Sequence, residues 1–269
     1  MSAGGTVLVE SPEEGVRLLR LNRPERLNTM THELLTDLHA ALDYADRADD
    51  VRVVVITGAG RAFCAGLDLD GYDDGFDDGY GPVRGGLARQ REIASAAEKI
   101  RNLSKPVIAA INGPAAGGGL AVVLASDIRI AAADAVFSVA FIKAGFSACD
   151  IGTSWLLPRI VGAGRAHELM LTGRRFDAEE AERIGLLYRI VDGAELMDVA
   201  LAKAREIMSN PPFSVELTKQ GMWLALETPS FHASVELENR QQILTAMTED
   251  RREATAAFLE KRPPRYRNR

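Results

Sequence analysis

Two glycine-rich stretches have the composition of loops that offer backbone N–H groups to a negatively charged oxygen. In the first, Gly117–Gly119 follow the apolar run Val107–Ile111 and precede small apolar residues at helical spacing. Glycines at the start of a helix leave its first N–H groups uncovered, at the positive end of the helix dipole. An anion or a developing oxyanion suits such a position. For a single glycine-rich turn, close packing of helix on strand is the commoner explanation.

The second stretch has the same organisation. Thr57–Leu69 follows the apolar run Val51–Ile56 and breaks into small residues and glycine. Two such loops can each direct one N–H at the same carbonyl oxygen. Neither loop fits a nucleotide site, because no Lys-Ser/Thr pair follows Gly117, and Phe63 stands where a dinucleotide-binding turn has its third glycine.

Together, Arg61–Leu69 and Asn112–Leu120 resemble the crotonase family, also called the enoyl-CoA hydratase/isomerase superfamily. The resemblance extends from Val16 to the C-terminus. It implies that the backbone N–H groups of Leu67 and Gly118 polarise the carbonyl of a coenzyme A thioester. The thioester is then the substrate, and neither a separate cofactor nor a metal is expected.

The resemblance also implies where coenzyme A binds. Ala65, Gly66, Asp68 and Gly117 are among the residues expected to bind the substrate or its coenzyme A. Arg26 would meet a phosphate of coenzyme A, and the backbone around Leu27 would lie along the pantetheine. Phe258 and Lys261 match the family's terminal F-x-x-K and would reach a coenzyme A bound to a neighbouring subunit. Without the resemblance, Arg26 and Lys261 would be interpreted as surface charges and Phe258 as a helix core residue.

The acid–base groups depart from the family's pattern. Hydratases of this family place two glutamates beside the substrate, and the corresponding positions here are Ala121 and Phe141, which cannot transfer a proton. Asp150 is the one carboxylate in the right neighbourhood, in a match over Gly145–Gly152 that includes one extra residue. We expect Asp150 to be the single acid–base, with a pKa raised by an apolar pocket. Its alternative role is to cap the helix that opens near Gly152.

A repeat of aspartates, glycines and aromatic residues, Asp68–Gly81, follows the first oxyanion donor. Its spacing is not that of an EF-hand, so a solvated loop is the plain interpretation. Because it follows Leu67 directly, its aromatic residues are also candidates for a lid over the acyl group. The expected acyl pocket consists of Tyr72, Phe76, Tyr80, Ala121 and Phe141.

Strand and helix patterns alternate around these loops. Thr6–Glu10 and Val16–Leu21 predict a hairpin, and Thr31 predicts the cap of a helix that ends near Asp46. The remaining predictions are helices over Leu87–Leu103, from Ser154 and from Asp177, strands over Asp127–Ala131, Val136–Val139 and Leu187–Val191, and irregular chain over Phe141–Gly152. Alternation of this kind predicts an α/β fold, and the resemblance implies a stacked β-β-α spiral.

Glycines become scarce after Asn210-Pro211-Pro212, which marks a change in composition. We expect a spiral core over residues 1–209, which carries the acyl-CoA site, and a helical oligomerisation region over residues 210–269. The resemblance implies a homotrimer, or a hexamer built as a dimer of trimers.

Composition is that of a soluble protein. The chain has 269 residues, 46% of them hydrophobic, and a formal net charge of −6. No membrane span or signal peptide is expected, so we expect a cytoplasmic protein. Nucleic-acid binding is not expected despite the basic tail Lys261–Arg269. Cys64 and Cys149 are interpreted as reduced core or near-core residues, and the four histidines lack metal-ligand spacing.

An oxyanion site with one carboxylate predicts an acyl-CoA enzyme of the hydratase/isomerase type, in fatty acid metabolism by resemblance. One carboxylate is enough to move a double bond, because it can take a proton from one carbon and return it to another. It is less obviously enough for hydration. Thioester hydrolysis and non-catalytic acyl-CoA binding are the alternatives, and RNA binding is disfavoured by the negative net charge.

Overall fold

The computed structural model describes residues 5–70 and 81–269, and its first element is a β-hairpin. Strands β1 (Val7–Glu10) and β2 (Gly15–Leu21) run antiparallel, with Val7 opposite Leu21. The hairpin predicted from the sequence is confirmed, with small shifts at the strand starts.

Beyond the hairpin, the chain winds between two sheets. The larger sheet has the strand order β1-β2-β3-β4-β6-β9, and every pair after the hairpin is parallel. Its further strands are β3 (Val51–Gly58), β4 (Val107–Ile111), β6 (Ile128–Ala132) and β9 (Arg189–Val191). The smaller sheet consists of β5 (Ala115–Ala116), β7 (Val136–Ser138) and β8 (Arg175–Asp177). From β4 onward, successive turns add one strand to each sheet, as expected for a spiral.

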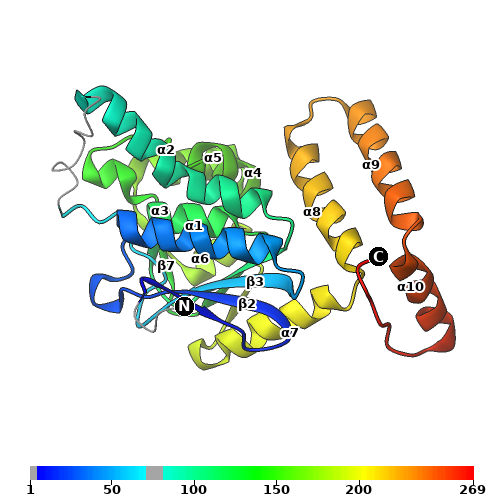
Figure 1. The fold of residues 1–269 in the computed structure, drawn as a ribbon. Coiled ribbons are helices and arrows are strands. Elements are labelled where there is room, and N and C mark those ends of the chain that lie inside the picture. The colour runs from blue at the N-terminus through cyan, green and yellow to red at the C-terminus, as the bar shows by residue number, and fades with distance from the viewer. Residues whose placement is uncertain (1–4, 71–80) are drawn as a thin grey trace.

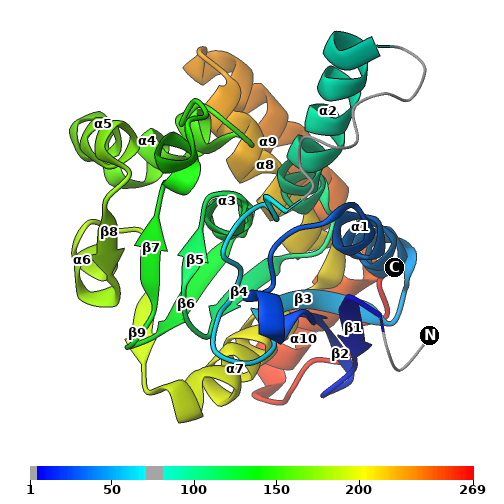
Figure 2. The same ribbon diagram turned by 90° about the vertical axis from the view of Figure 1, so that its left-hand side faces the viewer.

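Helices cover both faces of the larger sheet (Figure 2). Three of them lie on one face and one on the other, namely α1 (His32–Arg47), α2 (Gly81–Asn102) and α3 (Gly118–Ala125) opposite α7 (Leu196–Met208). In β3, Val53 and Val55 belong to the cluster around α7, whereas Val54 and Ile56 belong to the cluster around the other helices. A strand covered on both faces is apolar throughout, which explains the uninterrupted run seen in the sequence.

Two helix starts use the caps expected from the sequence. The Thr31 hydroxyl accepts the Leu34 N–H at 3.2 Å, where α1 begins. Asp177 accepts the Glu180 N–H at 2.8 Å at the start of α6. The helices that follow β7 are α4 (Thr153–Val161), α5 (Ala163–Thr172) and α6 (Ala178–Arg183).

Two predicted element starts and part of one predicted irregular segment are wrong. Helix α2 begins at Gly81, well before Leu87. Pro82 is tolerated in its first turn because a backbone N–H at that position would have no partner within the helix. The 3-10 helix Ala140–Ala144 occupies part of the segment predicted to be irregular. Strand β9 begins at Arg189, two residues later than the predicted start at Leu187.

The last three helices form an arm beside the core (Figure 1). They are α8 (Pro212–Glu227), α9 (Phe231–Ala246) and α10 (Glu249–Glu260). Helices α8 and α9 form an antiparallel pair (Figure 1). The change from mixed to wholly helical structure falls between α7 and α8, at the predicted composition shift. That residues 1–209 and 210–269 are separate domains stays a prediction.

The two cysteines differ in exposure. Cys64 is buried, as expected, but the near-core position expected for Cys149 is wrong, because it is exposed in the turn that precedes α4. In the described part of the chain, no helix combines the length and the hydropathy that a membrane span requires.

Candidate functional site

The two glycine-rich loops lie against each other. Cys64 forms a parallel bridge with Ala115, and the Ala116 N–H donates to the Cys64 carbonyl at 2.9 Å. A Cβ on Gly119 would lie 2.1 Å from that same carbonyl oxygen, so only glycine fits there. The last glycine of the Gly117–Gly119 run is therefore needed to bring α3 up to the Thr57–Leu69 loop.

Two neighbouring backbone N–H groups are left without a partner at this junction. Leu67 and Gly118 donate no hydrogen bond to any residue that the structure describes, whereas the N–H groups of Ala65, Asp68 and Gly117 all donate to backbone carbonyls. Gly118 is the first residue of α3, where an N–H has no partner within the helix. Both positions are those expected to donate to an oxyanion.

The two free N–H groups are close in space. The nitrogen of Gly118 lies 3.6 Å from the position that a Cβ on Gly66 would occupy, and Gly66 directly precedes Leu67. Helix α3 is buried along its whole length and apolar on all sides, so its N-terminus is held rigidly by the core. The junction can therefore offer two donors to one oxygen.

A cavity of about 100 Å³ opens beside this junction. Six residues expected at the site line it, namely Ala65, Gly66, Leu67, Gly117, Phe141 and Asp150. The ring of Phe141 lies over the backbone of Gly117, 3.6 Å from where a Cβ would stand. The other lining residues are Leu69, Gln90, Ile93, Ala140, Ala144, Phe146 and Ile151.

Asp150 is the only described lining residue with an ionisable side chain. Its Oδ1 accepts the Ile151 N–H at 2.7 Å and a short hydrogen bond from Gln90 Nε2. Burial raises the pKa of the Asp150 carboxyl, and the hydrogen bonds from Ile151 and Gln90 oppose that rise only in part. A carboxyl with a raised pKa in an apolar cavity has the property that acid–base work requires.

The alternative role of Asp150 as a helix cap is wrong. Gly152, with a φ of 74°, is the residue that precedes α4, and no side chain caps this helix. The Thr153 N–H donates to the main-chain carbonyl of Asp150 at 2.8 Å, which leaves the carboxylate to the cavity. Ile151 has a φ of 45°, a conformation that is costly for a β-branched residue. The Asp150 carboxylate itself accepts the Ile151 N–H, at 2.7 Å.

Comparisons with known proteins agree with this geometry. Residues 11–269 match the family model described as enoyl-CoA hydratase/isomerase. The chain is 41% identical over 265 residues to the probable enoyl-CoA hydratase EchA12 of Mycobacterium tuberculosis, covering 96% of this chain and 91% of that protein. It is 40% identical over 255 residues to the 1,2-epoxyphenylacetyl-CoA isomerase of Escherichia coli, covering 94% and 95%.

Among solved structures, a probable enoyl-CoA hydratase/isomerase from Mycobacterium abscessus superposes with a TM-score of 0.91 at 39% identity. The match covers 98% of this chain and 100% of that one. The chain belongs to the enoyl-CoA hydratase/isomerase family. Membership of the crotonase superfamily and the crotonase fold, both expected from the sequence, are thereby confirmed.

Not every residue that we expected at the site lies at the cavity. Ala121 is wholly buried inside α3 and is not part of the cavity lining, which corrects its place in the expected acyl pocket. Gly118 is not a lining residue either, but it lies close to one, because a Cβ on Gly118 would be 3.4 Å from Ile151 Cδ1. Tyr72, Phe76 and Tyr80 lie outside the described residues.

Asp68 has a structural role, because it links the chain after Leu67 to the segment Arg23–Thr29. Its carboxylate accepts hydrogen bonds from Arg23 at 2.9 Å, Arg26 at 3.1 Å and Thr29 at 3.1 Å. Burial by itself raises the pKa of the Asp68 carboxyl, but these hydrogen bonds hold it below its usual value. Arg26 also pairs with Asp70, and both side chains are exposed to solvent in part. That Arg26 meets a phosphate of coenzyme A stays a prediction.

Two residues that the sequence did not single out organise the site. Asn28 is fully buried, and its side-chain nitrogen donates to the carbonyls of Ala59 and Ala62, which ties the Leu27 turn to the Thr57–Leu69 loop. Leu27 and Asn28 both have left-handed φ values, 52° and 55°, a signal that the Leu-Asn pair carries only weakly. Gln90 had no local signal, because it is one of several polar residues on α2.

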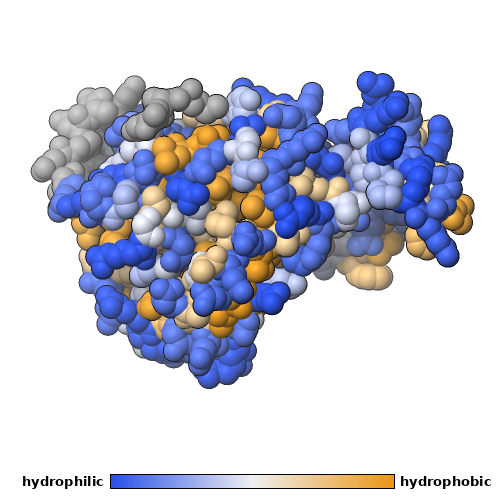
Figure 3. All heavy atoms as spheres, turned by 90° about the horizontal axis from the view of Figure 1, so that it is seen from below, coloured by the Kyte–Doolittle hydropathy of each residue, from blue (hydrophilic) through white to orange (hydrophobic). Residues whose placement is uncertain are grey.

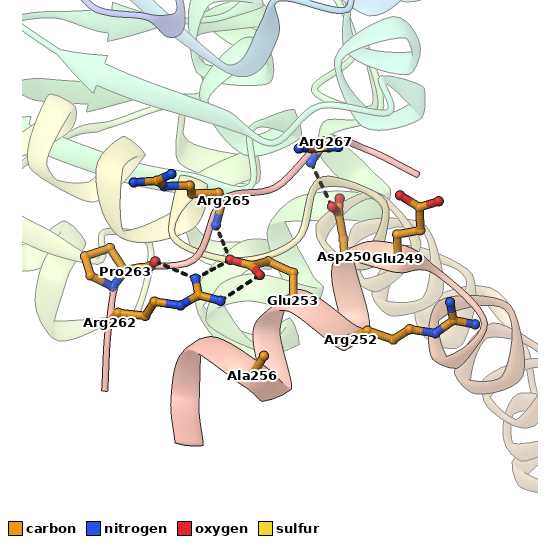
Figure 4. A pocket seen from close by; sticks show the side chains of 9 residues that line it. All are labelled: Glu249, Asp250, Arg252, Glu253, Ala256, Arg262, Pro263, Arg265 and Arg267. Carbon is orange, nitrogen blue, oxygen red and sulfur yellow. Dashed lines mark hydrogen bonds and ion pairs between the residues drawn. The ribbon is translucent and has the colours of Figure 1, made fainter. Parts of the chain in front are cut away.

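Phe258 and Lys261 lie at the end of the arm and do not line the cavity of their own chain. Phe258 is 82% exposed, so its alternative interpretation as a helix core residue is wrong. After Lys261, the tail folds back along α10 (Figure 4). Arg262 pairs with Glu253 at 2.6 Å, and the Arg267 N–H donates to Asp250 at 2.7 Å.

Proposed function

We propose that the protein is an acyl-CoA isomerase that forms a thioester enolate and moves a double bond with Asp150 as its single acid–base. The N–H groups of Leu67 and Gly118 supply the oxyanion site in this proposal. They are adjacent, unpaired and next to the cavity, which is the arrangement that stabilises developing negative charge on a carbonyl oxygen. Charge stabilised there acidifies the carbon next to the thioester.

The observation that carries the proposal is the position of Asp150. It is the only ionisable side chain among the described residues of the cavity, and the positions of the two hydratase glutamates hold Ala121 and Phe141. In a β,γ-unsaturated thioester, Asp150 would remove an α proton and the electrons would pass to the thioester oxygen as a dienolate. The protonated Asp150 would then return the proton to the γ carbon, which leaves an α,β-unsaturated thioester with no atom gained or lost.

The relatives are named for both reactions. The E. coli relative is named as an isomerase of an acyl-CoA, whereas the mycobacterial relatives are named as probable enoyl-CoA hydratases. Hydration requires that a water be activated as well as a proton delivered, and one carboxylate would have to do both. We therefore place hydration second, with thioester hydrolysis and simple acyl-CoA binding behind it.

Exchange of substrate hydrogen in D₂O tests the proposal without knowledge of the acyl chain. A panel of β,γ- and α,β-unsaturated acyl-CoA esters is incubated with the protein, and deuterium uptake, isomer ratio and water addition are followed by mass spectrometry and NMR. We expect isomerisation with deuterium uptake and no water adduct, and a loss of roughly 10²–10⁴-fold in Asp150→Asn. Water adducts as the sole product, or full activity of Asp150→Asn, would reject it.

We further propose that copies of the chain associate through the arm, as a trimer or a dimer of trimers. Large apolar side chains stand exposed on its three helices, and Figure 3 shows apolar patches at its margin. They are Met222, Leu226, Phe231, Ile243, Leu244, Met247, Phe258 and Leu259. Exposure of this extent is typical of an interaction surface. Sedimentation of wild type and of Ile243→Glu tests it, and a wild-type monomer at micromolar concentration would contradict it.

A further inference from the structure

Gln90 is the one uncharged polar side chain in the cavity lining, and it reaches Asp150. Of the lining side chains that the structure describes, only Gln90 and Asp150 are polar. They stand 60 positions apart in the chain, Gln90 on α2 and Asp150 before α4, and Gln90 Nε2 donates to Asp150 Oδ1. A polar pair inside an apolar cavity is costly unless its hydrogen bonds are made, so this contact is a specific feature of the site.

The two oxygens of the Asp150 carboxylate have different surroundings. Both hydrogen bonds to it, from Gln90 and from the Ile151 N–H, go to Oδ1. Oδ2 accepts no hydrogen bond from the described residues, and it is not sealed from solvent. Oδ1 is thus anchored from two directions, while Oδ2 is accessible and has no partner among the described residues.

We propose that Gln90 is a positioning residue, which holds the Asp150 carboxylate by Oδ1 so that Oδ2 is the oxygen that exchanges a proton with the substrate. The inference rests on the proposed function, because it assigns an orientation to the same acid–base. An amide is suited to this task, since it donates a hydrogen bond to the carboxylate but does not itself exchange the proton.

The helix that carries Gln90 is itself fixed to its neighbour. Next to Gln90, Arg89 pairs with Glu92 at 2.9 Å, and Glu92 lies 2.7 Å from His32 at the start of α1. On the Asp150 side, the Ile151 N–H donates to the same carboxylate oxygen at 2.7 Å. Both ends of the hydrogen bond therefore have a second restraint, which helps to hold a catalytic group in one geometry.

Loss of the Gln90 donor has two consequences for the reaction. The carboxylate gains rotational freedom, so a smaller fraction of bound substrate meets Oδ2 in a productive geometry. The hydrogen bond from Gln90 also lowers the pKa of the Asp150 carboxyl, so its removal raises that pKa further. A base whose pKa rises is deprotonated only at higher pH, and the acid limb of the pH–rate profile moves upward with it.

Gln90→Met tests the inference, because methionine keeps the length and helix propensity of glutamine and removes the donor. Arg91→Met is the matched control, one position along the same helix at an exposed site. In Gln90→Met we expect kcat to fall roughly 10- to 100-fold with KM little changed, and the acid limb of kcat/KM to move to higher pH. Arg91→Met should leave rate and profile at wild-type values.

If Gln90→Met does not fold, Gln90→Glu replaces it as a near-isosteric variant. Two carboxylates side by side repel, so this change should move the acid limb upward further still. If Asp150→Asn is inactive but a folded Gln90 variant has the wild-type kcat and an unmoved acid limb, the positioning role of Gln90 is overturned. Wild-type turnover in Asp150→Asn would instead reject the proposed function, so the two failures are distinguished by one additional protein.

Discussion

Lys219, on the first helix of the arm, lies with its Nζ 2.9 Å from Asp127 Oδ2, and both side chains are almost removed from solvent. Lys219 also donates to the carbonyls of Ile100 and Lys105 at 3.0 Å. Trp223, one helical turn further on α8, donates to the other oxygen of Asp127 at 2.9 Å. Asp127 lies two residues after the end of α3, so the arm is attached just beyond the C-terminus of the helix that begins at Gly118.

Lys219→Met is expected to destabilise the fold by about 3 kcal/mol or more, because it leaves the Asp127 charge and two carbonyls without their buried partner. Lys203→Met is the control, since Lys203 pairs with the exposed Glu206 and such a pair contributes about 0–1 kcal/mol. Urea unfolding of the two variants measures the difference. Equal midpoints would show that the buried pair does not hold the arm.

Gly119→Ala should disrupt the site, whereas Gly164→Ala should not. A Cβ at Gly119 would meet the Cys64 carbonyl oxygen at 2.1 Å, while Gly164 in α5 has open space around it. The first change forces the two loops apart at a cost of at least about 1–3 kcal/mol. The second replaces a helical glycine and should stabilise by about 0.4–1 kcal/mol. Melting temperatures that move in the same direction would contradict the packing described here.

The stability of Asp150→Asn should depend on pH differently from that of wild type. Burial raises the Asp150 pKa above its ordinary value of 3.8, so the folded state holds this proton more tightly than the unfolded chain. The stability from that proton is present at pH below 3.8 and is lost as pH rises through the folded pKa. Asparagine undergoes no such loss.

The melting temperature of Asp150→Asn, taken relative to wild type, should therefore increase as pH rises from 3.8 through the folded pKa and level off above it. Thermal unfolding at a series of pH values, with both proteins in the same buffers, measures it. A constant difference between the two curves would show that the carboxyl is not perturbed by its cavity.

Lys261→Gln should weaken coenzyme A binding roughly tenfold with the fold intact, if Lys261 contacts a phosphate on a neighbouring subunit. Arg252→Gln is the matched control, another exposed cation on α10. Calorimetric titration with coenzyme A measures both, after sedimentation has shown that each variant has the wild-type assembly state. Equal affinities for wild type and Lys261→Gln would remove Lys261 from the binding site.

What the sequence determined by itself is local or carried by consecutive residues. The apolar run Val51–Ile56 could only be a buried strand, Thr31 and Asp177 cap helices through residues three positions away, and Gly117–Gly119 mark a close approach of backbone. These signals depend on neighbouring residues in the chain, so periodicity and residue type are enough to detect them. The family resemblance added which N–H groups to examine.

Tertiary structure decided the rest, because the contacts involved join distant parts of the chain. Asp150 could have been a cap or an acid–base, and the left-handed turn at Ile151 and the packing of α2 settled where its carboxylate points. Gln90 is indistinguishable in sequence from its polar neighbours, and Ala121 and Phe141 differ in cavity exposure despite equivalent expectations. Burial and hydrogen-bond partners arise only when helices pack, so no pattern along the chain could have assigned these positions.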